Sequence, residues 1–201
     1  MNKLTAEQLR ELYGNPSGRA KDKVLTQLDS HSKAFINKSP FVVLSTINSS
    51  GAMDASPRGG QPGFVKFSAE GNVILPDAKG NNRIDSLINI AESGQIATLF
   101  FIPGVDELLR INGNAFITAD AKVLDLFSTE KKQMKTAIII EPKEIFLHCA
   151  KALMRSKIWS LDAQIERSTF PTIGEMLKDQ LNSNDPAESQ ESMLKRYQKD
   201  L

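Results

Sequence analysis

Short apolar runs separated by turn signals constrain this chain more than any other feature. Six or seven such runs lie between residues 41 and 147, and most are rich in β-branched and aromatic residues. The segments Asn48–Gly51 and Glu70–Asn72 have the composition of tight turns. The first run, Phe41–Leu44, is continuous and predicts a strand buried on both faces. Short strands joined by close turns are typical of a small barrel or a sandwich, so we expect a mainly β fold with six or seven antiparallel strands.

One amphipathic helix is expected between the strands, because apolar residues recur at i, i+3, i+4 and i+7. These residues are Ile84, Leu87, Ile88 and Ala91. They predict the buried face of the helix, whereas Ser86 and Asn89 fall on the polar side. Gly94 predicts its end.

The chain divides by composition into three stretches that together form one structural domain. Residues 1–39 are predicted to be an N-terminal helical segment, and residues 161–201 a C-terminal helical extension. The strands lie in residues 40–160. Thr5 and Gln8 have the spacing of a capping box at the first helix.

Two further segments have weaker patterns. Val24, Leu25 and Leu28 predict the start of a second helical stripe in the N-terminal segment. The segment Ser56–Gly63 contains so much Gly and Pro that we expect no regular element there.

Composition excludes several classes of function. The chain has 25 basic and 24 acidic residues and a net charge of +1, so it lacks the basic excess of a general nucleic-acid binder. No apolar run approaches ~20 residues and no secretory signal is visible, so no membrane partner is expected. The single Cys149 cannot form an internal disulfide and fits a reducing, cytoplasmic compartment. Two His and one Cys also make a metal site improbable, and none is predicted.

The segment from Asp77 to Arg83 is the first candidate site, because it lies between a predicted strand and the amphipathic helix. A helix N-terminus presents free N–H groups and a partial positive charge, which together favour an anion. Gly80 allows close approach of a ligand to the backbone, and Lys79 and Arg83 add full positive charges. The alternative is a purely structural one, in which Asn82 caps the helix and Asp85 completes the capping box.

Three other segments carry candidate side chains. Arg58 lies before a Gly pair and could meet a phosphate or a ring carbonyl, or it could stand in solvent on a loop. Arg110 alternates with apolar neighbours, so it faces either a cleft or solvent. His148 is better interpreted as a ligand-contacting or structural residue than as the base for Cys149, because adjacent side chains diverge. Cys149 itself is expected to be a small buried apolar residue.

Two basic residues follow His148 on a predicted helix. Lys151 and Arg155 are four positions apart and therefore share one face, where they could meet an anionic substrate or form a solvated stripe.

Four ordered blocks of the sequence resemble a known family. They are FVVLSTINSSGAMDASPRGGQPGFVKF, VILPDAKGNNRIDSLINI, IATLFFIPGVDELLRINGNAFI and IFLHCAKALMRSKIW. The first three resemble the pyridoxamine 5'-phosphate oxidase-related flavin proteins, which have the FMN-binding split-barrel fold. The last resembles a subgroup of FMN-dependent enzymes whose substrates are unidentified. The resemblance spans about residues 10–180 and implies that residues 40–160 form an FMN-binding split β-barrel.

The resemblance also implies a homodimer with two FMN molecules at the subunit interface, and it implies which residues bind the cofactor. In such proteins the segment matching residues 77–83 holds the FMN phosphate, and Arg83 matches a basic phosphate ligand. Asn82 stands where the oxidases often carry a second basic residue, so either Arg58 or Lys79 would supply that charge. Lys66 aligns with a basic FMN contact. The full predicted cofactor set is Arg58, Gly59, Lys66, Asp77, Lys79, Gly80, Asn81, Asn82, Arg83 and Ser86.

The chain departs from the oxidases where they bind pyridoxamine phosphate, because their C-terminal pattern of Trp and Arg is absent. The block around His148 stands there instead, and we expect His148, Lys151 and Arg155 on the substrate side. The sequence therefore predicts an FMN-dependent oxidoreductase acting on an unidentified small molecule, with no catalytic side chain assigned. The alternatives are a non-enzymatic flavin carrier or redox sensor, or a split barrel that binds haem or deazaflavin.

Overall fold

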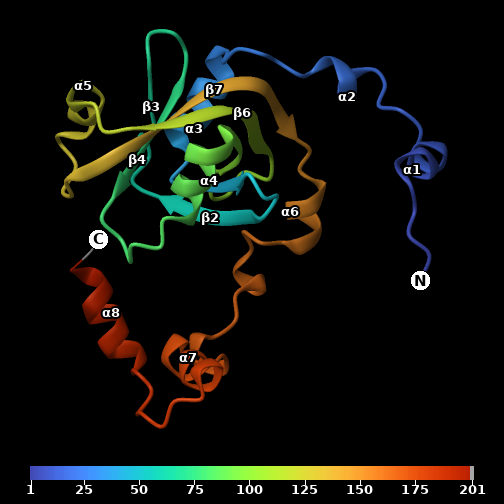
Figure 1. The fold of residues 1–201 in the computed structure, drawn as a ribbon. Helices are drawn as coiled ribbons and strands as arrows, with labels where there is room; N and C mark the ends of the chain where they lie inside the picture. The colour runs from blue at the N-terminus through green and yellow to red at the C-terminus, as the bar shows by residue number, and fades with distance from the viewer. Residues whose placement is uncertain (200–201) are drawn as a thin grey trace. The chain divides into compact units, whose positions relative to one another are not determined.

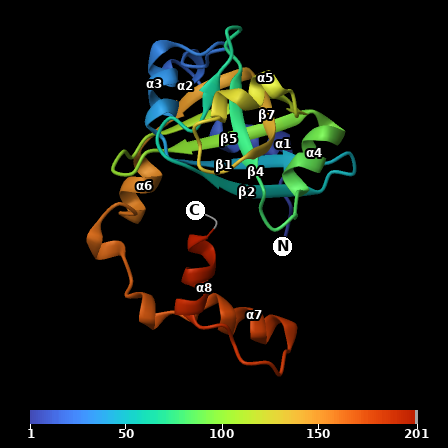
Figure 2. The same ribbon diagram turned by 90° about the vertical axis from the view of Figure 1, so that its left-hand side faces the viewer.

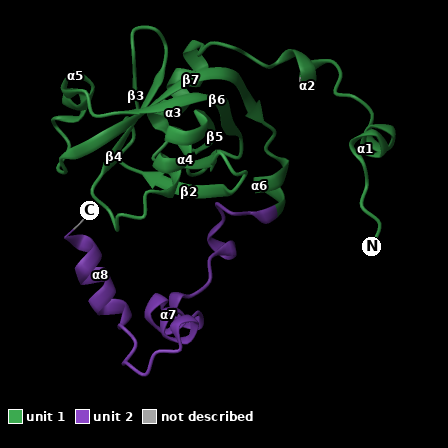
Figure 3. Ribbon diagram, in the orientation of Figure 1, with its two compact units in different colours: residues 1–155 green, residues 156–201 purple. Residues whose placement is uncertain are grey.

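The computed structural model describes residues 1–199, except for the side chain of Ala20. The chain forms two compact units, Met1–Arg155 and Ser156–Leu201 (Figure 3). The strands and the predicted cofactor residues all belong to the first unit.

A single sheet of seven strands forms the body of the first unit (Figure 1). Its strands are β1 (Phe41–Ile47), β2 (Met53–Gly59), β3 (Lys66–Phe67), β4 (Val73–Ala78), β5 (Gln95–Phe101), β6 (Leu108–Thr118) and β7 (Met134–His148). They are arranged in the order β2-β1-β5-β6-β7-β4-β3, and every neighbouring pair is antiparallel. The expectation of six or seven antiparallel strands is confirmed.

Strand β1 is buried on one face only. Val42, Leu44 and Thr46 point into the core, while the residues between them are half-buried or exposed. The prediction of burial on both faces was wrong. A run of four apolar residues does not distinguish a strand covered on both faces from a strand whose outer face is only partly covered. Each fully buried aliphatic side chain of this kind contributes roughly 1.5–3 kcal/mol to folding.

Strand β2 is a correction to the sequence interpretation, because part of the Gly- and Pro-rich segment Ser56–Gly63 is a regular strand. Every residue of β2 pairs with β1, from Met53 opposite Ile47 to Gly59 opposite Phe41. Pro57 is compatible with the strand because β2 lies at the edge of the sheet, where its missing N–H breaks no ladder on the outer side.

The longest pairing in the sheet joins β6 to β7. Its register shifts between Asn112 and Gly113, so the ladder contains a bulge at this point. A Cβ on Gly113 would lie 2.2 Å from the carbonyl oxygen of Glu141, so the two backbones approach too closely for any other residue. Strand β7 is continuous, with Pro142 inside it next to the bulge.

Helix α4 (Asp85–Ser93) lies against one face of the curved sheet and contacts β1 and β2 (Figures 1 and 2). Its buried residues are Ser86, Asn89 and Ile90, whereas Ile84 and Ile88 are nearly half exposed. Of the predicted buried face, Leu87 does pack against the core, but Ile84, Ile88 and Ala91 are exposed, so the prediction was wrong for most of the face. The reason is that α4 covers polar groups of β1 and β2, so its polar side chains turn inward to meet them. The helix ends at Gly94 in the left-handed conformation, as predicted.

The remaining α-helices of the first unit are α1 (Ala6–Tyr13), α2 (Arg19–Asp22), α3 (Ser30–Lys38), α5 (Ala121–Leu124) and α6 (Lys151–Ser156), which ends at the boundary with the second unit. Of these, α3 contacts β6 and α5 contacts β7, whereas α1 buries none of its residues (Figure 1). The capping box of Thr5 and Gln8 is present at α1. The predicted helical stripe at Val24, Leu25 and Leu28 is not helical, because Leu25 forms a short antiparallel bridge with Ile145.

The second unit is a small helical hairpin of α7 (Ile173–Leu181) and α8 (Gln190–Gln198). A Cβ on Gly174 would lie 2.1 Å from the backbone oxygen of Glu188, so α7 and the segment before α8 are in close contact. The Arg167 guanidinium donates to the carbonyl oxygens of Phe170 and Pro171 and to the side chain of Gln190, which ties the loop to α8.

Candidate cofactor site

Strands β2 and β4 are not hydrogen-bonded to each other. Side chains bridge the gap between them, which we call the split. Arg58 of β2 and Asp77 of β4 form an ion pair, with 3.4 Å between Nε and Oδ1. Their side chains are only 24% and 18% exposed. The structure therefore brings together two predicted cofactor residues that lie on non-neighbouring strands.

Burial and the ion pair act on Asp77 in opposite directions. Desolvation raises the pKa of Asp77 above its usual value, and the Arg58 guanidinium opposes the rise without cancelling it. The carboxylate is therefore held in its charged form mainly by Arg58.

A polar cluster under α4 continues from this pair along β2. Asp54 and Ser56 share the inner face of the strand with Arg58, and Ser56 Oγ donates to Asp54 Oδ2 at 2.8 Å. Ser86, at the start of α4, also donates to Asp54. Asp54 was not predicted as a site residue. The alternation of Asp54, Ser56 and Arg58 would have indicated it, had residues 53–59 been taken as a strand.

The start of α4 has no side-chain cap. Its N-cap residue is Ile84, which has no side chain able to accept from the first-turn N–H groups. The structural alternative, in which Asn82 caps the helix, is therefore wrong, and Asn82 takes a left-handed conformation with φ 61°. Asn81 accepts a hydrogen bond from the Arg83 backbone N–H at 3.0 Å and so shapes the loop before the helix. The helix N-terminus is left open to an external anion.

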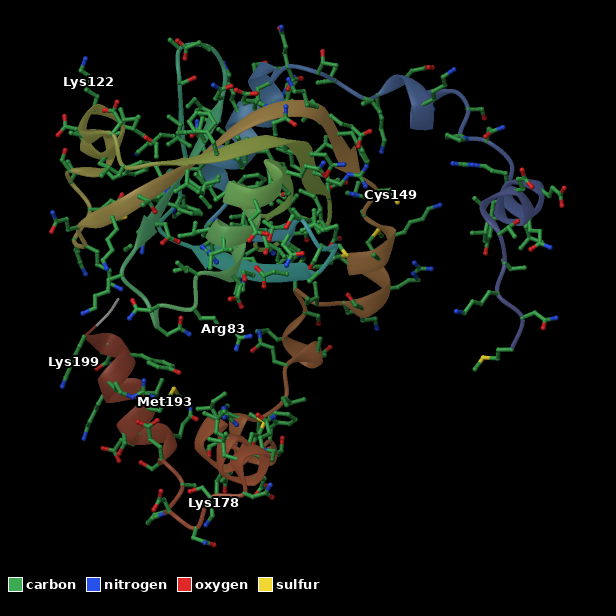
Figure 4. All side chains as sticks on the ribbon, viewed as in Figure 1. Arg83, Lys122, Cys149, Lys178, Met193 and Lys199 are labelled. Atoms are coloured by element: carbon green, nitrogen blue, oxygen red, sulfur yellow. The ribbon has the colours of Figure 1, made fainter. Side chains whose placement is uncertain are left out.

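Two exposed basic side chains, those of Lys79 and Arg83, lie in the loop just before this open helix start. Arg83 is 80% exposed and pairs with Asp85 at 2.7 Å (Figure 4). Lys79 and Gly80 are exposed beside it, and a Cβ on Gly80 would meet no atom within 4 Å. Lys66 lies on β3 and donates to the carbonyl oxygen of Gly63 at 2.9 Å. Gly59 ends β2 opposite Phe41, so it is part of the strand and not of the loop.

The predicted substrate-side residues lie elsewhere in the first unit. His148 ends β7 on the outer face of the sheet, whereas Asp77 and Arg58 point to the inner face. Burial lowers the pKa of His148, and the positive charges of Arg110 and Lys23 lower it further. Lys151 and Arg155 are exposed on α6 and, as predicted, four residues apart on one helix. Cys149 is exposed, so its expected burial was wrong (Figure 4).

A surface groove of about 420 Å³ lies over the outer face of β1, β5 and β6. It is lined by Ser45, Thr46, Ile47, Met53, Gln95, Ile96, Ala97, Asn112, Gly113, Asn114 and Lys143. None of the predicted cofactor residues lines it, because the inward side chains of β2 face the other way.

Comparison with known proteins identifies the family. The family model described as pyridoxamine 5'-phosphate oxidase matches residues 28–149, which is more than half of the chain. The chain belongs to the pyridoxamine 5'-phosphate oxidase family. No curated protein is similar enough in sequence to count as a relative.

Solved structures resemble this family member at low sequence identity. HupZ from Group A Streptococcus is 18% identical with a TM-score of 0.50, over 60% of this chain and 94% of that one. A variant of HupZ with one histidine replaced by alanine is 17% identical with the same TM-score, over 61% and 100% of the two chains. HutZ from Vibrio cholerae, a haem storage protein, is 12% identical with a TM-score of 0.42, over 61% and 94%. The HupZ likeness concerns the fold alone, and with the antiparallel sheet and the family it confirms the predicted split barrel with flanking helices.

The helices of residues 1–199 are all too short or too polar to cross a lipid bilayer.

The ion pair across the split predicts a specific stability defect. Arg58→Met leaves the largely buried Asp77 carboxylate without its counter-charge, and we expect a loss of about 1–3 kcal/mol in the free energy of unfolding at pH 7. The loss shrinks as the pH falls through the raised pKa of Asp77, because the protonated carboxyl needs no partner. Urea unfolding measures both effects.

The double variant Arg58→Met/Asp77→Asn is the control and should recover most of the loss in the free energy of unfolding. Equal destabilisation in the single and the double variant would contradict the role given to the ion pair.

Proposed function

We propose that this protein is an FMN-binding oxidoreductase that transfers electrons between its flavin and an unidentified small molecule. The observation that carries the proposal is the uncapped N-terminus of α4, which directly follows the loop that carries Lys79 and Arg83, in a member of this oxidase family. Free N–H groups, a helix dipole and two cationic side chains are the combination that binds a phosphate.

The residues present fit the phosphate end of FMN. The first-turn N–H groups of α4 lack a side-chain cap, and Gly80 leaves the approach to the backbone open. Arg83 is exposed and can exchange part of its contact with Asp85 for a phosphate oxygen, because a guanidinium has five donors. Of the two residues that could supply the second charge, the geometry favours Lys79. Arg58 is already paired with Asp77, whereas Lys79 is exposed and makes no ion pair among residues 1–199.

The inner edge of the split would hold the rest of the flavin. Lys66, fixed by the carbonyl oxygen of Gly63, and Gly59 at the end of β2 are proposed to contact it. Ser86 is held on Asp54 and would act through the position of α4. When bound, FMN supplies the electron-transfer chemistry, and the chain binds it, orients it and keeps water from one side of it. His148, Lys151 and Arg155 remain the proposed substrate-side residues.

We further propose that the protein is a homodimer formed through the outer face of β1 and β5. Most side chains on this face are apolar, with Ser45 and Gln95 as the polar ones, and they are only half-buried or exposed. Contiguous apolar side chains left partly exposed in this way are typical of an interaction surface. Val43 pairs with Leu99, and the rings of Phe41 and Phe101 meet edge to face with centroids 5.7 Å apart. A second copy of the chain would cover this face.

Removal of the Arg83 charge tests the phosphate site. Arg83→Ala should weaken FMN binding about tenfold, the effect of one charge-assisted hydrogen bond, and should leave riboflavin binding unchanged because riboflavin has no phosphate. Quenching of flavin fluorescence measures both affinities. Lys122→Ala is the matched control, since Lys122 is an exposed basic residue on α5 in the same unit (Figure 4). Unchanged FMN affinity in Arg83→Ala would show that the phosphate assignment is wrong.

A charge placed on the outer face tests the homodimer. Val43→Glu puts a carboxylate among apolar side chains and should convert a dimer into a monomer, as sedimentation equilibrium would measure. Phe116→Glu is the control, because Phe116 is an exposed apolar residue on another part of the sheet. A wild-type protein that sediments as a monomer, or a Val43→Glu variant that remains dimeric, would contradict the proposed interface.

A further inference from the structure

Three groups that carry or can acquire positive charge surround one aromatic ring on the outer face of the sheet. The ring is Phe146 of β7. The Arg110 guanidinium carbon lies 4.0 Å from its centroid and the Lys23 ammonium nitrogen 5.2 Å from it. The His148 ring lies 5.1 Å away and is tilted by 50°. Within residues 1–199, no other aromatic ring has cation–π contacts with both a lysine and an arginine.

The pairing of the strands creates this cluster. Arg110 of β6 is opposite Phe146, and Leu108 is opposite His148, so Arg110, Phe146 and His148 lie near one another at the end of the β6–β7 ladder. The N-terminal segment is held there by the bridge between Leu25 and Ile145. Lys23, two residues earlier, donates to the carbonyl oxygen of Leu147. Residues more than a hundred positions apart in sequence are therefore held at one place by backbone contacts.

The cluster has more positive than negative charge. Glu144 accepts from Arg110 at 2.6 Å and from Asn112 at 3.0 Å, and this carboxylate balances only one of the cations. Lys23 has no carboxylate partner among residues 1–199. The repulsion from Lys23 and Arg110 adds to burial in keeping His148 neutral. An anion at this place would be attracted by Lys23 and Arg110 and would allow His148 to become charged.

The polar groups of the cluster also have unused hydrogen-bonding capacity. Arg110 Nε is a donor buried without a hydrogen-bond partner, and this is the group that an anion could satisfy. A guanidinium offers five donors, and the contact with Glu144 uses one of its nitrogens. A buried donor left unpaired is unfavourable, because it has lost its water without gaining a partner, so a site of this kind is favoured to take up a polar ligand.

We propose that Lys23, Arg110 and His148 form an anion subsite, and that it binds a carboxylate or phosphate group of the substrate. The assignment of this anion to the substrate rests on the proposed oxidoreductase function; the subsite itself does not. Arg110 provides planar donors held by Phe146 and Glu144, Lys23 provides a mobile ammonium group, and His148 donates a hydrogen bond when it is charged. The substrate class is therefore a small organic acid or a phosphate ester.

The two histidines of the chain make this proposal measurable by NMR. His148 and His31 each give a resolvable ring signal, and the variant His31→Gln assigns them. Malonate is the carboxylate probe and inorganic phosphate the phosphate probe, each added to the full-length protein against NaCl at equal ionic strength. We expect at least one probe to raise the pKa of His148 by about 1, because an opposite charge within a few ångströms favours the imidazolium. The ring signal of His31 is the internal control and should not respond to either probe. Whichever probe acts identifies the preferred anion class, and the absence of any response at His148 overturns the proposal.

Neighbouring lysines provide matched variants. Lys23→Gln should weaken the affinity for the active probe about threefold, the effect of one exposed charge, whereas Lys21→Gln should leave it unchanged. Both residues are exposed, so neither variant should unfold the chain. An equal effect in the two variants would contradict the part given to Lys23.

The same samples separate this proposal from the proposed function. Flavin fluorescence reports FMN binding independently of the His148 signal. If FMN binds and His148 does not respond to the probes, the subsite is wrong and the flavin site stands. If FMN does not bind and His148 responds, the subsite stands without the oxidoreductase. Competition between FMN and the probe for His148 would overturn the assignment to substrate, since the anion would then be the flavin phosphate.

Discussion

Strand β2 is an edge strand, with β1 as its hydrogen-bonding neighbour on one side only. The arrangement of the candidate site depends on which side chains cover the other side of β2. The sheet places β2 at one edge and β3 at the other, so within residues 1–199 no backbone ladder closes the barrel. Side chains do so instead: Arg58 reaches Asp77 of β4, and Asp54 accepts from Ser86 of α4. These polar contacts determine which side of α4 is turned towards the sheet. Its polar side chains are turned inward, and its N-terminus is placed beside the split, where the loop of residues 79–83 supplies the cationic groups.

Much of the fold was predictable from local patterns. All the strands except β2, the position of α4 and its end at Gly94 follow from periodicity and from residues with special backbone preferences. The bulge at Gly113 also had a local signal, although the Glu141 backbone that makes a side chain impossible there is distant in sequence. Periodicity and glycine positions depend only on residues close together in the chain, so they can be identified from a single sequence.

The errors have a common physical cause, which is that edge strands and polar interfaces do not follow the usual patterns. Pro57 and its neighbouring glycines suggested a loop, but an edge strand tolerates proline because one side of its ladder is empty. The apolar stripe of Ile84 and Ile88 suggested the buried face of α4, but the helix covers Thr46 and Asp54 and buries its polar side chains against them. The cluster around Phe146 was not predictable at all, since Lys23 reaches it through a bridge with β7.

Family membership and site chemistry support the flavin assignment in different ways. The family establishes the split barrel, and within that fold the open start of α4 provides a place for a phosphate. The most direct test is the absorption spectrum of the purified protein, with the mass of any cofactor released on denaturation. The account predicts bands near ~370 and ~450 nm and the mass of FMN, either as purified or after addition of FMN. A protein that carries haem, or that is colourless and does not bind added FMN, would contradict it.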